Sequence, residues 1–403
     1  MPGPVTVVHA SDEPPASWDA SVFLAGPSPR SADVASWRPA AVELIRRQWV
    51  GPGELVVFVP EPADGRPWAD YDDQRLWELR WLGVADQVVF WVPRDLATLP
   101  GLTTNDEWGW TKDGGRAVFG SPPGAAKVRY QREYARDHGV PTADSLAETL
   151  RIALDRIGAG ERRSAGERDV PLLVWTTPVF RAWYAGLRKA GNTLLGARLV
   201  WTFRADEGRT VVYSAVHVSV AIAAEGGRVK ANEVVLSRPD ISAVLLYRRA
   251  PDVRDTRLVL VREFRAPGLA RDGYVRELPG GSASYDVAPQ DRALAEVREE
   301  TGLGLAAERL RGHGVRQVAA SSSAHRAWLY SAELTDREME LLGADGSAHG
   351  EGGAGGEERT YVEVTTYGEL LGSDGVDWTT VGMVAQILAD LGGPSAPEDG
   401  AGQ

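Results

Sequence analysis

The sequence contains no cysteine, which excludes disulfide bonds, thiolate metal ligands and cysteine nucleophiles. Histidine is also scarce, with six residues that form no HxH or HxxxH pair, so a histidine-bound zinc site is not expected. No stretch of 18 uninterrupted apolar residues occurs, so no transmembrane helix is expected.

A dense basic patch is missing as well. The formal net charge is −12, and a chain of this charge repels polyphosphate backbones and anionic membrane surfaces. The first fifteen residues show no basic segment followed by an apolar one, as a secretory signal would. We therefore expect a cytoplasmic protein whose partners are small molecules, with no nucleic acid and no membrane among them.

The length of 403 residues suits two domains, and 43% hydrophobic content suits packed cores. A small, charged, glycine-bearing stretch at 161–170 is typical of a linker. We expect one domain over 1–160 and a second over 171–395. A glycine-rich insertion at 343–358 cannot pack a core and is expected to be mobile, and 396–403 is expected to be a disordered tail.

In the first domain, short apolar runs alternate with segments that have apolar residues at helical spacing. The runs lie at 21–25, 54–60, 86–92 and 116–120. This alternation predicts an α/β domain in which helices flank a parallel sheet, and ligands of such sheets gather beyond the carboxyl ends of the strands. The second domain is richer in β-like runs and ends in a helix-like segment near its carboxyl terminus, which predicts an α+β arrangement.

One segment of the second domain, ALAEVREETGLGL at 293–305, carries three carboxylates on one helix face. Glu296, Glu299 and Glu300 stand at i, i+3 and i+4, so their side chains converge within one turn. Converging carboxylates repel one another unless a divalent cation neutralises them. The alternative is a solvated acidic helix face that ends at a glycine.

Together with ELPGGS upstream, this segment resembles the signature of the Nudix hydrolases, and LVREFRAP before it is similar to the ADP-ribose pyrophosphatase type. The resemblance implies a Nudix-type α+β sandwich and a Mg²⁺ (or Mn²⁺) site. The implied metal ligands are Gly280, Glu277, Glu296, Glu299 and Glu300, with Glu296 and Glu299 also in catalytic roles. Two positions depart from the signature, where Ala295 replaces an arginine and Val287 replaces a glutamate.

Two further features of this domain have open interpretations. A mobile loop contributes a glutamate in related pyrophosphatases, and Glu351, Glu357 and Glu358 are equal candidates here. Arg262 and Arg265 are candidates for binding a phosphate, or are surface charges on a strand edge.

The first domain carries its own candidate chemistry. FLAGP at 23–27, Asp86 beside an apolar run and TTNDEWGW at 103–110 resemble motifs of the nucleoside 2-deoxyribosyltransferases and their nucleotide N-glycosidase relatives. The resemblance implies a flavodoxin-like sheet with Glu107 as nucleophile, Asp86 acting on the base, and no cofactor. Breaking an N-glycosidic bond needs a carboxylate near the sugar C1′ and a proton donor near the departing base.

The substrate-binding residues implied around this centre are Gly26, Trp37, Arg38, Trp108 and Gly109. The two tryptophans are candidates for stacking on a nucleobase, and the arginine is a candidate for binding a phosphate or carboxylate. Core packing is the alternative for the tryptophans, and an unpaired surface charge is the alternative for the arginine. Gly101 departs from the family pattern, which has an aspartate six residues before the nucleophile.

Taken together, these motifs predict a bifunctional nucleotide-processing enzyme. One domain would cleave or transfer at an N-glycosidic bond, and the other would hydrolyse a nucleoside diphosphate derivative with Mg²⁺. Two alternatives stay open: an NAD glycohydrolase joined to an ADP-ribose pyrophosphatase, and a glycosidase regulated by a non-catalytic, nucleotide-sensing second domain. Both resembled families imply a homo-oligomer.

Overall fold

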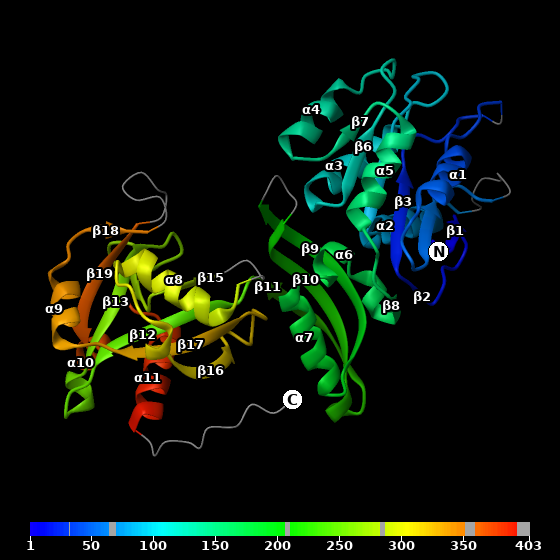
Figure 1. Ribbon diagram of the computed structural model, residues 1–403. Helices are drawn as coiled ribbons and strands as arrows, with labels where there is room; N and C mark the ends of the chain where they lie inside the picture. Colours follow the sequence, from blue (N-terminus) through cyan, green and yellow to red (C-terminus); the bar gives the residue numbers. More distant parts are fainter. Residues whose placement is uncertain (32, 64–69, 206–209, 283–286, 351–358, 393–403) are drawn as a thin grey trace. The chain divides into compact units, whose positions relative to one another are not determined.

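The computed structural model describes residues 1–31, 33–63, 70–205, 210–282, 287–350 and 359–392. In these residues the chain is mixed α/β, with a six-stranded parallel sheet, antiparallel strands and eleven α-helices. It divides into two compact units, Met1–Arg238 and Pro239–Gln403 (Figure 1).

The first unit is built on the six-stranded sheet, in the order β1-β4-β3-β5-β6-β7 with every pair parallel. Its strands are β1 (Val5–His9), β3 (Ala20–Ala25), β4 (Leu55–Val59), β5 (Gln87–Trp91), β6 (Ala117–Gly120) and β7 (Thr142–Ala143). All residues of the four central strands are buried, as expected for a parallel sheet covered on both faces. The predicted apolar runs contain these four strands, so the prediction of a parallel α/β sheet is confirmed.

Five helices cover this sheet: α1 (Arg38–Gln48), α2 (Tyr71–Val84), α3 (Leu102–Thr111), α4 (Arg129–Asp137) and α5 (Leu146–Ile157). Helices α1 and α5 contact each other, and α5 packs on β5 and β6. The main core cluster joins Phe58 and Phe90 of the sheet to Trp81 of α2 and Trp108 of α3. Aromatic residues from the sequence motifs therefore supply much of this core.

The first unit continues beyond the parallel sheet with β2 (Ser17–Trp18), β8 (Arg163–Ser164), α6 (Leu172–Trp175), α7 (Pro178–Lys189), β9 (Thr193–Ala205), β10 (Thr210–Ile222) and β11 (Arg228–Ser237). The last three strands form an antiparallel sheet in the order β11-β10-β9. Strand β9 contacts α2, which ties this sheet to the rest of the unit. The structure therefore divides the chain after β11, whereas the sequence prediction began the second domain at residue 171.

The segment predicted as a linker, 161–170, is packed into the first unit. Arg163 is fully buried, and its guanidinium donates to both carboxylate oxygens of Asp86, at 2.8 and 2.6 Å. Charged and small residues suggested an exposed connection, but the arginine is buried because a buried carboxylate neutralises it.

Asp86 itself is 1% exposed and accepts further hydrogen bonds from Ser21 N at 2.8 Å, Ser21 Oγ at 2.9 Å and Leu172 N at 2.7 Å. It therefore joins the beginnings of β3 and α6 to the predicted linker. Its full set of acceptor positions is occupied by protein donors.

The second unit is built on one eight-stranded sheet, with the path β16-β17-β12-β13-β19-β18, while β14 pairs with β13 and β15 with β12. These strands are β12 (Ile241–Arg248), β13 (Arg257–Phe264), β14 (Tyr274–Glu277), β15 (Gly280–Ser282), β16 (Arg311–Gln317), β17 (Arg326–Glu333), β18 (Ala348–His349) and β19 (Thr360–Thr366). The β12–β17 pair is parallel and the other pairs are antiparallel.

The helices of this unit are α8 (Pro289–Thr301), α9 (Asp336–Ala344), α10 (Tyr367–Leu370) and α11 (Trp378–Gly392). One core cluster packs α8 and α9 on the sheet, and another packs α10 and α11 on it. The first part of the insertion predicted at 343–358 has regular structure, because it includes the end of α9 and strand β18. In this part, His349 Nε2 lies 2.7 Å from Asp345 Oδ2. Residues 351–358 and the tail predicted at 396–403 lie outside the described residues.

We predict that Asp86→Ala destabilises the first unit by about 3–5 kcal/mol, because it leaves the Arg163 guanidinium buried without its counter-charge. Urea unfolding followed by tryptophan fluorescence measures this, since twelve of the 14 tryptophans lie in Met1–Arg238. The control is Glu43→Ala, which breaks the exposed Arg46–Glu43 pair of α1 at 2.8 Å and is expected to cost less than about 0.5 kcal/mol. Equal effects of the two substitutions would contradict the structural role of Asp86.

Candidate functional site

The candidate site of the first unit lies at the carboxyl edge of the parallel sheet. Gly26 follows β3 with φ +144°, a conformation that other residues rarely adopt. A Cβ at this position would lie 2.2 Å from the Trp91 carbonyl oxygen and 2.9 Å from the Trp37 ring. The glycine therefore allows the turn after β3 to pass against the end of β5.

Arg38, the first residue of α1, is 2% exposed and holds this turn in place. It donates from Nε to Leu24 O at 3.0 Å, from Nη2 to Gly26 O at 2.7 Å and from Nη1 to Ser28 Oγ at 3.0 Å. It also pairs with Glu61, just after β4. The guanidinium of Arg38, the candidate for binding a phosphate, is thus already bound to protein acceptors. It acts on the site through its positive charge.

Glu107 is half-buried on α3, and its surroundings favour the protonated form. Burial, together with the charges of Glu78 and Asp106, raises its pKa from 4.5 to about 7, although the charge of Arg38 lowers it. The predicted nucleophile therefore lies within electrostatic reach of the buried arginine at the carboxyl edge.

Glu78, on α2, is the second carboxyl of this site. Burial raises its pKa, while a hydrogen bond from Gln74 Nε2 at 2.8 Å and the charge of Arg38 lower it. The sequence analysis did not single out Glu78, although the YDDQRLWE helix contained a usable signal: Gln74 and Glu78 stand at i and i+4, where side chains meet.

A polar network positions the start of α3. Arg94, 7% exposed, donates to Asn105 Oδ1 at 2.6 Å and to Gly101 O at 3.3 Å, and Gln131 Nε2 donates to Asn105 Oδ1 at 2.7 Å. Gly101 precedes the helix with φ +58°, and a Cβ there would lie 2.9 Å from Pro27 Cβ. The position where the resembled family has an aspartate therefore requires glycine in this fold.

The structure does not bring Asp86 to this site. Strands β3 and β5 run in register from Val22 opposite Gln87 to Ala25 opposite Phe90, so Asp86 lies at the amino edge. The five residues from Ser21 to Gly26 span roughly 16 Å along an extended strand. Asp86 is therefore a structural residue, and the predicted role on the base does not fit its position.

The tryptophans predicted to contact a base are mostly buried. Trp108 is 3% exposed and packs between Phe90 and Phe119, with ring centroids 5.2 and 5.1 Å away. Trp37 is 8% exposed and donates its Nε1 to Pro27 O at 3.1 Å. Both are packing residues in this structure, the alternative that the sequence left open.

Gly109 needs no special conformation, because a Cβ there would meet nothing within 4 Å. It lies on the exposed side of α3, next to Trp108. Its predicted part in substrate binding is therefore not supported by a close approach of neighbouring atoms.

In the second unit, two of the three glutamates of α8 are buried against one turn. Glu300 accepts a hydrogen bond from Gly280 N at 2.8 Å, and a Cβ at Gly281 would lie 2.1 Å from Glu296 Oε1. Glu296 and Glu300 are 6% and 5% exposed, whereas Glu299 is exposed. The structure therefore brings Glu296, Glu300 and Gly280 together, as the sequence motifs predict.

Arg292 pairs with Glu296 close to Ala295, one of the two positions where the sequence departs from the signature that it resembles. Its Nη2 lies 2.5 Å from Glu296 Oε1, one helical turn before the position where Ala295 replaces the family arginine. The other altered position, Val287, is 42% exposed. The positive charge next to Glu296 therefore comes from Arg292 and not from position 295.

The remaining predicted residues of this unit are engaged in ion pairs. Arg265 pairs with Glu277 and Glu263, both at 2.9 Å. Arg262 pairs with Glu363 at 3.2 Å, and its guanidinium lies over the Tyr274 ring, 4.6 Å from the centroid. Both arginines are thus surrounded by protein groups.

Carboxylate and carbonyl oxygens are the donors that Mg²⁺ prefers. Among the described residues, however, no group of three or more His, Asp or Glu side chains is placed to hold a metal ion. The donor types of Glu296, Glu299, Glu300 and Gly280 suit Mg²⁺, but their arrangement here does not form a complete ligand set. Glu351, Glu357 and Glu358 lie outside the described residues.

Comparison with known proteins adds no assignment: no family model and no curated protein matches the chain. None of the helices in the described ranges is both long and apolar enough to span a membrane. The function of the chain is therefore inferred from its motifs and from the geometry of its sites.

We predict that Glu107→Gln stabilises the first unit at pH 8 but not at pH 4. The unfolded glutamate ionises near 4.5 and the folded one near 7, so the wild-type protein loses stability as the pH rises through this window. Glutamine removes that loss, a gain of about 1–3 kcal/mol at pH 8, because one pKa unit corresponds to about 1.4 kcal/mol.

Urea unfolding at both pH values measures the difference, with Glu43→Gln as the exposed control. A Glu107→Gln gain of equal size at both pH values would show that the glutamate is not protonated by its surroundings.

Proposed function

We propose that the first unit cleaves or transfers at the N-glycosidic bond of a nucleoside or nucleotide, with Glu107 as the nucleophile. The observation that carries this proposal is the raised pKa of Glu107, which burial and the charge of Glu78 raise and the charge of Arg38, bound at the carboxyl edge of the parallel sheet, lowers. Ligands of such sheets bind at this edge. The flavodoxin-like fold implied by the motifs is part of the same proposal.

The charge of Glu78 helps to raise the pKa of Glu107, so the loss of one proton from this pair opposes the loss of the second and favours a singly protonated pair. This state suits glycosidic cleavage, because one carboxylate attacks while the other carboxyl donates. In the proposed reaction Glu107 attacks C1′, the C1′–N bond breaks, and its electron pair passes to the base nitrogen, which takes the proton from Glu78. Glu78 thus takes the role that the sequence analysis gave to Asp86.

The glycosyl ester on Glu107 is then resolved. Ionised Glu78 removes a proton from a water molecule that attacks C1′, which releases the sugar and restores both carboxyls to their starting states. A second base in place of water gives transfer. NAD contains the same type of bond, so cleavage at its nicotinamide is the variant of this reaction that the sequence analysis kept open.

For the second unit we propose Mg²⁺-dependent hydrolysis of a nucleoside diphosphate derivative on a Nudix-type sandwich. The supporting observation is the convergence of buried Glu296 and Glu300 on the Gly280–Gly281 turn. These glutamates, Glu299 and the Gly280 carbonyl would hold the ion, which neutralises diphosphate charge and activates water when bound.

The Arg292–Glu296 pair favours a competing function, in which this unit binds a nucleotide without cleaving it. The arginine supplies a positive charge to Glu296 from the protein itself. Cleavage assays with and without metal separate the two functions.

Base release tests the first site. With the full-length chain and a panel of nucleosides, nucleotides and NAD, Glu107→Gln should lower the rate of base release at least about 1,000-fold, as expected when a nucleophile is removed. Activity should rise with pH through about 7, because Glu107 must be ionised to attack.

Glu78→Gln should lower the rate about 100-fold or more, because it removes the proton donor. Glu43→Gln is the control with unchanged release. Retained base release in Glu107→Gln would refute the assignment.

Diphosphate cleavage tests the second site. With ADP-ribose as probe, cleavage should require Mg²⁺, and Glu300→Gln should lower it at least about 100-fold. Glu308→Gln, at an exposed position after α8, should leave it unchanged. Binding of ADP-ribose by calorimetry with no cleavage at any Mg²⁺ concentration would support the sensor function instead.

A further inference from the structure

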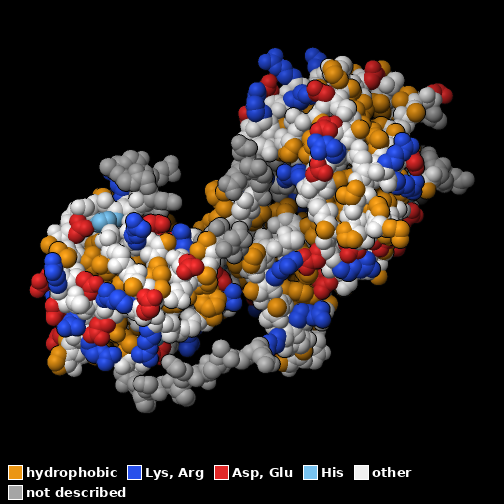
Figure 2. Space-filling view, viewed as in Figure 1, with side chains coloured by type: hydrophobic (Ala, Val, Ile, Leu, Met, Phe, Trp, Pro, Cys, Tyr) orange, Lys and Arg blue, Asp and Glu red, His pale blue; other side chains and the backbone are white. Residues whose placement is uncertain are grey.

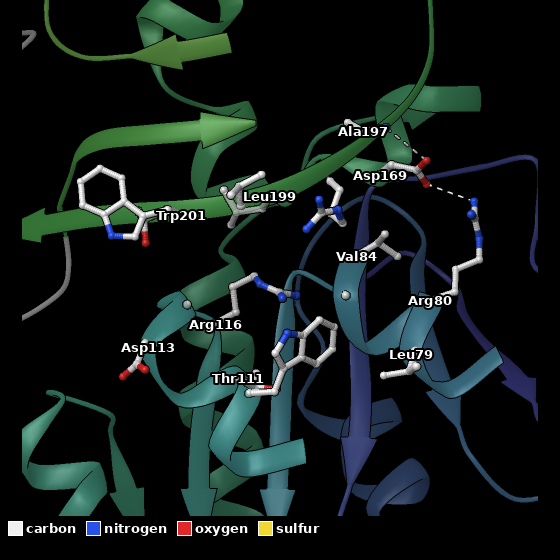
Figure 3. Close-up of a pocket in the computed structure, with 16 residues that line it drawn as sticks. Leu79, Arg80, Val84, Thr111, Asp113, Arg116, Asp169, Ala197, Leu199 and Trp201 are labelled. Atoms are coloured by element: carbon white, nitrogen blue, oxygen red, sulfur yellow. Dashed lines mark hydrogen bonds and ion pairs between the residues drawn. The ribbon is translucent and has the colours of Figure 1, made fainter. Parts of the chain in front are cut away.

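Apart from the carboxyl-edge site, the first unit contains a cavity of about 380 Å³ that the proposed reaction does not use. It is lined by the final turns of α2 and α3, the residues before β6, and strand β9 (Figure 3). Because Arg116 directly precedes β6, the cavity lies at the amino edge of the parallel sheet, while Arg38 and Gly26 lie at the carboxyl edge. Its volume falls in the range of pockets for small organic ligands.

Arg116 gives this cavity an uncompensated buried charge. The residue is 7% exposed, and it donates from Nη1 to the carbonyls of Leu82 and Ala85 at 3.2 and 2.5 Å. Its Nε is buried and has no hydrogen-bond partner among the described residues. In Figure 3 its side chain points into the space that Val84 and Leu199 border.

The nearest acidic influence on Arg116 comes from Asp86, which raises its pKa while burial lowers it to about 10. Both oxygens of Asp86 are already bound by Arg163. Two buried guanidinium groups therefore share one carboxylate, and the two carboxylates that line the cavity, Asp113 and Asp169, pair with other cations. Buried charges are normally paired, so an anionic group in the cavity completes the arrangement.

Further arginines surround the cavity. Arg198 of β9 lines it and forms no ion pair within the described part of the chain, and Arg80 pairs with Asp169 at 3.3 Å. Beside the cavity, Arg156 and Arg204 both contact Gly115, and the charge of Arg204 contributes to lowering the pKa of Arg156. Arginines gather here although the chain has a net charge of −12 and its visible face mixes both signs (Figure 2).

The walls of the cavity supply flat apolar surface. Trp110 of α3 and Trp201 of β9 both line it, and they are 56% and 51% exposed, unlike the buried tryptophans of the core. Figure 3 shows Trp201 and Leu199 extending from the same strand. Exposed tryptophans beside arginines suit a ligand that carries both a planar ring and an anion.

We propose that this cavity binds a nucleotide, with its phosphate at Arg116 and Arg198 and its base against Trp110 and Trp201. The site is separate from the carboxyl-edge site of Glu107, and it involves no bond cleavage. Neither the phosphate nor the base alone fills both parts of the cavity. A nucleoside monophosphate therefore binds more tightly than its two halves.

The test uses full-length protein labelled with 5-fluorotryptophan and followed by ¹⁹F NMR, with AMP, adenosine and inorganic phosphate as probes. Trp201→Phe assigns the Trp201 resonance. AMP is expected to shift this resonance with saturation, and adenosine and phosphate to bind at least about tenfold more weakly.

Arg198→Ala and Trp110→Ala should each raise the AMP midpoint at least about fivefold, because they remove a charge and a ring surface without touching the core. Arg228→Ala is the matched control on β11, since within the described residues Arg228 pairs only with its neighbour Glu225, and it does not line the cavity. Its midpoint should stay within about twofold of wild type.

No saturable shift of Trp201 up to ~10 mM AMP would overturn the proposal. So would an AMP midpoint that Arg198→Ala and Trp110→Ala leave unchanged. Either result leaves the base-release test of Glu107 unaffected, because that test reads a different site.

Discussion

The buried carboxylate of Asp86 holds the first unit together. It receives hydrogen bonds from the beginning of β3, the beginning of α6 and the fully buried guanidinium of Arg163. These contacts join the parallel sheet to the chain segment that continues into α7 and the antiparallel sheet. One carboxylate accepts all of these hydrogen bonds. The amino end of the parallel sheet and the segment that leads to β9, which lines the arginine cavity, therefore both depend on the charge of Asp86 for their position.

Because all strands of the parallel sheet point the same way, its carboxyl edge and its amino edge are two different chemical environments. At the carboxyl edge, Arg38 lies between carboxyls whose pKa values are raised, an arrangement suited to moving a proton and forming a covalent bond. At the amino edge, arginines outnumber the acids that face them, which suits the binding of an anion. In the two proposals made above, one edge of the sheet carries the chemistry and the other binds a ligand.

Much of the fold could be predicted from the sequence, because the buried parallel strands read as continuous apolar runs. The helix of Glu296 and Glu300 and its preceding glycines were also recognisable, since spacing on a helix and the need for glycine are local properties. Glu107 was identified from its motif, and the structure places it beside Arg38.

The failures concern tertiary partners. Asp86 looked catalytic because its motif resembles one of the nucleoside 2-deoxyribosyltransferases, but only the fold shows at which edge of the sheet it lies. Residues 161–170 looked like a linker because nothing local reveals that Arg163 meets a buried carboxylate. Trp108 looked available to a base, yet Phe90 and Phe119 enclose it. Glu78 was overlooked because it matters through its effect on the pKa of Glu107, which lies on another helix, α3.

Helix α3 carries Glu107 near one edge of the sheet and Trp110, less than one turn later, in the wall of the arginine cavity. Helix α2 likewise carries Glu78 next to Leu79 of that wall. A ligand that shifts either helix from one end changes the free energy of occupying the other. Thermodynamic linkage makes such coupling reciprocal, so each ligand alters the affinity of the other by the same factor. The ten residues of α3 are therefore the segment through which the two proposed sites would be coupled.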